Sequence, residues 1–164
     1  MRVCKQADLV MLFYTLRNLF DKETVKNNFA YYENCTLHDS SLSLCIHSLM
    51  ASRLNMPELA FELFGKCCEV DLGENTDNSD SGIHSASIGG IWLALAMGFG
   101  GVRAEEDDLI IEPILPEGIT SYSLPIIYRG SKYQLNVDAD DAKVRRLSGE
   151  PQAVVLNGRT VESK

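Results

Sequence analysis

The sequence has 164 residues, of which 45% are apolar, enough for the packed core of one domain or of two small ones. Its 15 basic and 23 acidic residues give a net charge of −8, and the sequence contains no Lys/Arg cluster interleaved with aromatic residues. This balance argues against nucleic-acid and anionic-membrane partners. Since no apolar run reaches membrane-spanning length and the N-terminus is too polar for a signal peptide, we expect a cytoplasmic protein.

The cysteines are odd in number and have no secreted context, so we expect them to be reduced and mostly buried. They are Cys4, Cys35, Cys45, Cys67 and Cys68. A zinc site would need four ligands, which Cys35, His38, Cys45 and His47 could supply. Because Cys45 and His47 lie two residues apart on a predicted helix, they face different ways, and we predict no metal site.

The first hundred residues have the apolar spacing of about five helices. The first, from Gln6 to about Phe20, is apolar nearly all round and must be covered on most sides. A second helix begins after Asp21, which has the character of an N-terminal cap. The third follows the loop Cys35–Asp39 and ends around Leu54, and the fourth begins near Pro57. Short loops between successive helices indicate an antiparallel array.

The stretch Thr36–Ser43 places hydroxyl groups directly before the third helix. Asp39 or Ser40 can accept hydrogen bonds from the free amides of the first helical turn, which would make the stretch a simple helix cap. A helix N-terminus flanked by Ser40 and Ser41 can also bind an anion, because free N–H groups and the positive end of the helix dipole point outward. The residues alone leave both interpretations open.

The segment Asp71–Gly82 is polar, acidic and without periodicity, and we predict a long loop. It does not fit an EF-hand calcium loop, because counting from Asp77 puts Ile88 where the bidentate glutamate should be. A fifth helix is expected from about Ser85 to Gly98. Its adjacent glycines, Gly89 and Gly90, are costly inside a helix and therefore suggest close packing or ligand access.

After about Gly100 the apolar period changes from helical to two. Alternating residues predict strands before Pro113, around Tyr122–Tyr128 and around Tyr133–Val137. Asn157-Gly158, between two short apolar segments, predicts a hairpin. The fold class is therefore mainly α with a small antiparallel β-sheet at the end.

Four stretches, in this order and at compatible spacing, resemble the C-terminal end of glycoside hydrolase family 65, which includes maltose, trehalose, kojibiose and nigerose phosphorylases. The resemblance covers almost the whole chain. The stretches are Lys5–Asp8, Tyr31–Ser43 with its Tyr-Glu and His-Asp-Ser elements, Gly82–Ser87 and Gly98–Arg103. The resemblance implies that residues 1–103 are part of an (α/α)6 catalytic barrel and that residues 104–164 form a C-terminal antiparallel β domain.

The reaction that the resemblance implies is inverting phosphorolysis of an α-glucosyl disaccharide to β-glucose 1-phosphate and a free sugar. Phosphate takes the place of the water of an inverting glycosidase, and no cofactor or metal is expected. By resemblance, Ser40, Ser41 and His84 contact phosphate, and Lys5 and Gln6 contact glucose hydroxyls. Without the family, Lys5 and Gln6 would be solvated residues at a helix start and His84 a structural histidine.

In the family the general acid is a glutamate upstream of the Lys-Gln motif, so no catalytic residue is expected in this chain. About five helices cannot close a twelve-helix barrel, and the apolar first helix would be left partly bare. We therefore expect a C-terminal fragment that is inactive alone and that partners the missing N-terminal part of the barrel. A non-catalytic remnant, a sugar- or phosphate-binding module and part of a family 65 hydrolase remain alternatives, and the disaccharide and a homo-oligomeric state stay open. Glu33 and Asp39 are expected to orient neighbouring groups, and His38 is expected to hold the loop.

Overall fold

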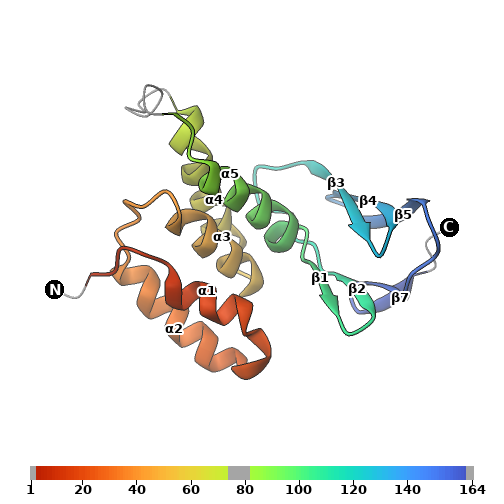
Figure 1. The fold of residues 1–164 in the computed structure, drawn as a ribbon, viewed down its shortest axis with the longest axis horizontal. Helices are drawn as coiled ribbons and strands as arrows, with labels where there is room; N and C mark the ends of the chain where they lie inside the picture. The colour runs from red at the N-terminus through yellow and green to blue at the C-terminus, as the bar shows by residue number, and fades with distance from the viewer. Residues whose placement is uncertain (1–2, 74–81, 162–164) are drawn as a thin grey trace. The chain divides into compact units, whose positions relative to one another are not determined.

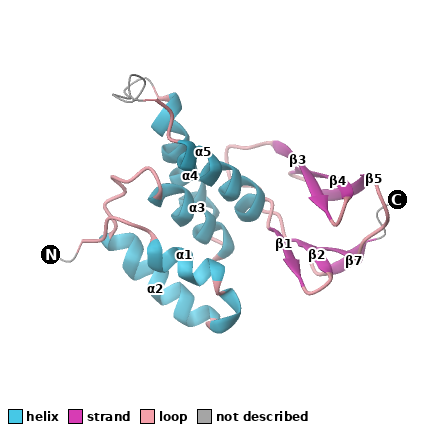
Figure 2. Ribbon diagram, viewed as in Figure 1, coloured by secondary structure: helices cyan, strands magenta, loops and turns pink. Residues whose placement is uncertain are grey.

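A computed structural model of the chain describes residues 3–73 and 82–161. The chain divides into two compact units, Met1–Ala94 and Leu95–Lys164. Helices come first in the chain and strands follow (Figure 2), so the predicted helical part with a β tail is confirmed. The domain boundary expected between residues 103 and 104 falls inside the first strand, Val102–Glu105.

Five α-helices occur in the described part of the first unit (Figure 1). Three of them form the centre of the unit, because α3 packs against α4 and α5 contacts both. The remaining pair, α1 and α2, contact each other, and α1 also contacts α3. The bounds are α1 Asp8–Thr15, α2 Lys22–Cys35, α3 Ser43–Arg53, α4 Pro57–Leu72 and α5 Ser85–Leu93.

Two helix starts are confirmed by their local chemistry. The Asp21 side chain caps α2 by accepting a hydrogen bond from the backbone N–H of Thr24 at 2.8 Å. Pro57 opens α4, where its missing N–H costs nothing. Two helix ends differ from the prediction. The first helix stops at Thr15 and continues only as a 3-10 turn over Arg17–Leu19, and α4 runs on to Leu72, into the segment predicted as loop.

Neither Asp39 nor Ser40 caps the third helix, so the simple cap, one of the two interpretations of this stretch, is wrong. α3 begins at Ser43 with Leu42 as its N-cap, and no side chain caps it. The reason is a turn before the helix, in which the Ser43 N–H donates to the Ser40 carbonyl at 3.1 Å. Ser40 and Ser41 therefore lie in the turn that leads into α3, and not in its first helical turn.

The fifth helix is correct in extent but changes its hydrogen-bond pattern. After Leu93 the chain continues as a π-helix over Ala94–Phe99, which apolar spacing cannot distinguish from an α-helix. Gly90 is buried against α3: a Cβ built on it would overlap the Cys45 Sγ and lie 2.8 Å from the Cys45 Cβ. The close packing expected of this glycine pair is thus present at Gly90, whereas a Cβ on Gly89 would meet nothing within 4 Å.

The apolar surface of α1 is only partly covered within the described chain. Val10 and Phe13 are buried, whereas Leu9, Leu12 and Leu16 keep between 38% and 43% of their surface exposed. This agrees with the expectation that the first helix is left partly bare. In the described residues no helix combines the length and apolar character needed to cross a membrane.

The second unit contains two sheets. One is a three-stranded antiparallel sheet in the order β3-β4-β5, and the other has four strands in the order β1-β2-β6-β7. The pairing of β2 with β6 is parallel, which the expected small antiparallel sheet did not include. The bounds are β1 Val102–Glu105, β2 Asp108–Ile111, β3 Ser121–Tyr128, β4 Ser131–Asp138, β5 Ala142–Ser148, β6 Val154–Leu156 and β7 Arg159–Val161.

One core lies between the strands of this unit. Alternate residues of β4 point inward, and Tyr133, Leu135 and Val137 are buried as their period of two predicts. They pack with buried residues of β1, β2, β3 and β6 in one hydrophobic cluster. The predicted hairpin at Asn157-Gly158 is confirmed by the antiparallel pairing of β6 with β7.

Candidate functional site

Main-chain hydrogen bonds join the N-terminal segment to the loop after α2. The Cys4 N–H donates to the Cys35 carbonyl at 2.8 Å, and the Leu37 N–H donates to the Cys4 carbonyl at 3.1 Å. Cys4 and Thr36 form an isolated parallel β-bridge. The Lys5-Gln6 dipeptide that follows Cys4 is thereby held beside the loop that carries Ser40 and Ser41.

A pocket of about 440 Å³ lies where this segment, the loop and the start of α5 meet. All five residues predicted to contact phosphate or glucose line it: Lys5, Gln6, Ser40, Ser41 and His84. We call it the candidate pocket. Its remaining lining residues are His38, Asp39, Leu44 and Val70. The structure therefore brings together, in one cavity, side chains that are spread over 80 positions of the sequence.

In the candidate pocket, the residues predicted to contact phosphate are half-buried, and the residues predicted to contact glucose are exposed. Ser40, Ser41 and His84 belong to the half-buried class, whereas Lys5 and Gln6 are open to solvent. The Ser40 hydroxyl donates a hydrogen bond to the side-chain oxygen of Gln6 at 3.2 Å. This contact fixes one predicted phosphate group against one predicted sugar group.

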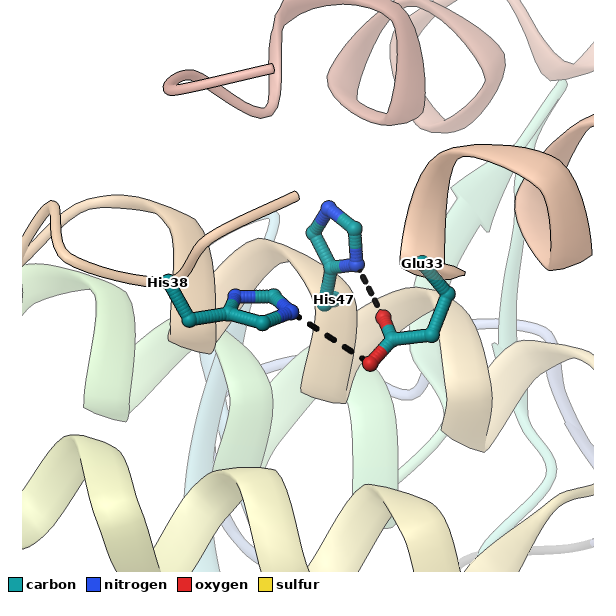
Figure 3. Close-up of side chains that lie close together, drawn as sticks. All are labelled: Glu33, His38 and His47. Atoms are coloured by element: carbon teal, nitrogen blue, oxygen red, sulfur yellow. Dashed lines mark hydrogen bonds and ion pairs between the residues drawn. The ribbon is translucent and has the colours of Figure 1, made fainter. Parts of the chain in front are cut away.

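The loop before α3 contacts a hydrogen-bond network formed by Glu33, His38 and His47 (Figure 3). His38 has a positive φ of 54° and turns its ring toward Glu33, with 3.3 Å between Nε2 and the carboxylate. The other ring nitrogen of His38 lies 3.1 Å from the Ser43 hydroxyl, which donates to the Ser40 carbonyl at 3.0 Å. The network thus connects α2 to the backbone of the turn at Ser40–Ser43: Glu33 contacts both imidazole rings, and His38 contacts Ser43 in the loop.

The carboxylate of Glu33 is kept ionised by this network. Burial would raise its pKa, but the hydrogen bonds and charges of His38 and His47 outweigh burial and lower the pKa to about 2. His47 is fully buried and donates from Nδ1 to the second carboxylate oxygen. An ionised carboxylate only accepts hydrogen bonds, so Glu33 can orient both imidazole rings at once.

This network is also a group that could hold a metal ion. Glu33, His38 and His47 each offer a ligand atom, and the three atoms lie within 4.8 Å of one another. Two of these residues belong to the zinc set considered from the sequence, but neither Cys35 nor Cys45 takes part. Both carboxylate oxygens already accept hydrogen bonds from imidazole nitrogens, whereas the buried His47 Nε2 has no hydrogen-bond partner among the described residues.

His84 is the N-cap residue of α5, directly before the helix as predicted. Its partner, Asp71 near the end of α4, was not singled out from the sequence. The Asp71 carboxylate lies 2.8 Å from the His84 Nδ1 and accepts the His84 backbone N–H at 3.1 Å. The two residues are separated by 13 positions, with 74–81 of the predicted loop outside the described residues, and no sequence pattern indicates the pairing.

The cysteines match their predicted burial only in part. All five are free, but only Cys45 and Cys67 are buried, and the other three are half-buried. Cys4 and Cys35 lie close together, with 3.9 Å between their sulfur atoms. Both flank the segment and the loop that form the candidate pocket.

Comparison with known proteins supports one family for the whole chain. The model of the glycosyl hydrolase family 65 central catalytic domain matches residues 1–93, and the model of the family 65 C-terminal domain matches residues 102–163. A solved structure named as a candidate kojibiose phosphorylase from the human microbiome superposes with a TM-score of 0.89 at 29% sequence identity. The superposition covers 97% of this chain and 24% of the chain in the solved structure.

Curated relatives carry the names of three disaccharide phosphorylases. An alpha,alpha-trehalose phosphorylase of Geobacillus stearothermophilus is 37% identical over 96% of this chain. A kojibiose phosphorylase of Halothermothrix orenii is 38% identical over 98% of it, and a maltose phosphorylase of Bacillus subtilis 34% identical over 94%. The chain spans 21% of the length of each of these relatives. The chain belongs to glycoside hydrolase family 65, of which it matches the end of the central catalytic domain and the C-terminal domain.

Proposed function

We propose that this chain supplies the phosphate contacts and part of the glucose contacts of an inverting disaccharide phosphorylase. The observation that carries the proposal is the candidate pocket, which is lined by all five residues expected to make these contacts. The names of the relatives, which include trehalose, kojibiose and maltose phosphorylases, support the same reaction class.

The chemistry of the candidate pocket suits an oxyanion. The hydroxyls of Ser40 and Ser41 can donate to phosphate oxygens, and His84 can donate from its ring when protonated. Lys5, which lines the same pocket, adds a positive charge. A phosphate held here would stand in for the water that attacks the sugar in an inverting hydrolase.

The sugar contacts are assigned to Lys5 and Gln6. Their side chains are exposed at the edge of the candidate pocket, and both offer groups that hydrogen-bond sugar hydroxyls. The hydrogen bond between Ser40 and Gln6 would keep the attacking phosphate next to the glucose ring. The general acid is expected on a part of the catalytic domain outside this chain, and the acceptor sugar is set there as well.

The proposal is tested by measuring phosphate affinity of the chain by calorimetry. Ser40→Ala, Ser41→Ala and His84→Ala should each weaken phosphate binding about tenfold to a hundredfold, because each removes a hydrogen bond to a charged group. Ser148→Ala, an exposed serine of β5, is the matched control and should not change the affinity. Phosphate binding that is equal in all four variants, or absent in the wild-type chain, contradicts the proposal and favours a hydrolase or a remnant.

A further inference from the structure

We propose that Asp71 fixes His84 in the tautomer with the proton on Nδ1, so that phosphate binding in the candidate pocket is coupled to the uptake of one proton. The inference rests on the proposed phosphate site, and it concerns a residue outside the candidate pocket. Asp71 is a positioning residue in this account: it acts on phosphate only through the imidazole ring of His84.

The Asp71 carboxylate makes three contacts with His84, one to the ring and two to the backbone nitrogen. Asp71 Oδ1 lies 2.8 Å from His84 Nδ1, and the two carboxylate oxygens lie 3.2 and 3.1 Å from the His84 backbone nitrogen. The Asp71 side chain is 13% exposed and the His84 side chain 36% exposed. The carboxylate therefore sets both the backbone at the start of α5 and the rotation of the ring.

The hydrogen-bond pattern determines which ring nitrogen carries the proton. The hydrogen bond from the His84 ring, opposed by burial and aided by the His84 backbone N–H, lowers the pKa of Asp71, so the carboxylate is ionised and can only accept. Nδ1 must therefore be the donor. In neutral His84 the proton sits on Nδ1, and Nε2 is left as an acceptor. Within the described residues, Nε2 has no hydrogen-bond partner.

This tautomer restricts how His84 can meet a phosphate. An Nε2 lone pair repels the oxygens of hydrogen phosphate dianion, unless a proton lies between the two atoms. Neutral His84 with dihydrogen phosphate and protonated His84 with hydrogen phosphate contain the same number of protons. Starting from neutral His84 and the dianion, formation of either complex takes up one proton from solution. The affinity for phosphate should then fall about tenfold for each unit that the pH rises above the neutral range.

Other titratable groups near His84 have to be separated from this effect. Lys5 lies on the N-terminal segment and His38 and Asp39 on the loop, all lining the candidate pocket, and Cys67 lies one turn before Asp71 on α4. His38 already contacts Glu33 and Ser43 through its two ring nitrogens. A Cys67→Ala variant, carried through the same measurements, removes the buried thiol from consideration.

The tautomer can be read directly by nitrogen NMR of the imidazole rings, because the chain has only three histidines. In the wild-type chain at about pH 8.5, where histidine is neutral, His84 should show the Nδ1–H form. Asp71→Asn should release the ring into the more common Nε2–H form, since an amide no longer demands an N–H donor. Glu69→Gln, an equal change of charge at an exposed position of α4, should leave His84 unchanged.

Phosphate affinity is then measured by calorimetry at about pH 6.5, 7.5 and 8.5 in the same proteins. Wild type, Glu69→Gln and Cys67→Ala should lose affinity steeply with rising pH. Asp71→Asn should bind phosphate more weakly at low pH and with a much flatter profile, because its Nε2–H can donate without an added proton. Unchanged signals of His38 and His47 show that the variant is folded.

Four results would contradict all or part of the inference. An Nε2–H tautomer of His84 in the wild-type chain refutes the role of Asp71, whether or not phosphate binds. A flat pH profile in the wild type, or an equally steep one in Asp71→Asn, refutes the proton uptake. Failure of the chain to bind phosphate at any pH contradicts the proposed function and the proton uptake, while the tautomer measurement still decides the positioning role.

Discussion

The Ser40 hydroxyl donates a hydrogen bond to the side-chain oxygen of Gln6, although the two residues are 34 positions apart. The contact exists because main-chain hydrogen bonds between Cys4 and the segment Cys35–Leu37 bring the N-terminus onto the loop before α3. One predicted sugar contact and one predicted phosphate contact therefore touch each other. In a phosphorylase the attacking phosphate and the glucose ring must be neighbours, and this arrangement meets that requirement.

Gly90 of α5 lies directly against Cys45 of α3, and Gly90→Ala is expected to destabilise the helical unit. The new methyl group would overlap the Cys45 side chain, and overpacking of a tight core typically costs about 1 to 3 kcal/mol. Urea unfolding of wild type and Gly90→Ala measures this loss in the free energy of unfolding.

The neighbouring glycine provides the matched control. A methyl group on Gly89 meets no atom within 4 Å, so Gly89→Ala should be neutral or should stabilise α5 by up to about 1 kcal/mol. If both alanine variants lose the same stability, close packing at Gly90 is not the reason for the glycine there.

Glu33→Gln should remove a pH-dependent contribution to stability. The folded-state pKa of Glu33 is about 2, below the ordinary value of 4.5, so the contribution is complete above about pH 4.5 and is lost as the pH falls toward 2. A shift of this size corresponds to about 3 kcal/mol in the free energy of unfolding. We expect Glu33→Gln to be less stable than wild type by this amount at neutral pH, and the difference to shrink on acidification.

Urea unfolding at several pH values between neutral and about pH 3 checks this prediction. Glu69→Gln, which neutralises an exposed carboxylate on α4, should remain within about 0.5 kcal/mol of wild type. A Glu33→Gln protein whose deficit is the same at every pH would mean that lost packing, and not the ion pairs with His38 and His47, explains its effect.

In the β unit, replacing Tyr122 or Tyr128 by phenylalanine should have opposite effects on stability. The Tyr122 hydroxyl lies 2.7 Å from the Phe99 carbonyl and 3.0 Å from the Ile114 carbonyl, so it can donate to either. Burial raises the pKa of this hydroxyl well above its usual value. Tyr122→Phe should cost about 1 to 2 kcal/mol, because buried carbonyls lose their donor.

Tyr128 is the control for this loss. Its hydroxyl is buried without a hydrogen-bond partner among the described residues, so Tyr128→Phe should be neutral or slightly stabilising. Thermal unfolding of the two variants separates the cases. Equal melting temperatures for both would contradict the hydrogen bonds assigned to Tyr122.

The helical part was largely predictable because its signals are local. Asp21 and Pro57 mark helix starts through their own side chains, and both starts were correct. The predicted start of α3 was wrong because a backbone turn from Ser40 to Ser43 precedes the helix. Serines are common both in such turns and at helix caps, so the residues there are compatible with both.

Long-range pairings were not predictable in the same way. The parallel pairing of β2 with β6 joins segments with the whole β3-β4-β5 sheet between them in the chain, and alternation cannot identify the partner of a strand. The contact of Asp71 with His84 likewise depends on how α4 and α5 pack. The residues of the candidate pocket were found through family motifs, whereas local periodicity alone left Ser40 and Ser41 open between a cap and an anion site.

The most direct test of the central claim is a titration of the isotope-labelled chain with inorganic phosphate, followed by amide NMR. A phosphate site in the candidate pocket predicts saturable shifts of the Ser40, Ser41 and His84 signals, with Ser148 in the β unit unaffected. Shifts confined to other parts of the chain, or no shifts at millimolar phosphate, would contradict a phosphate site in the candidate pocket.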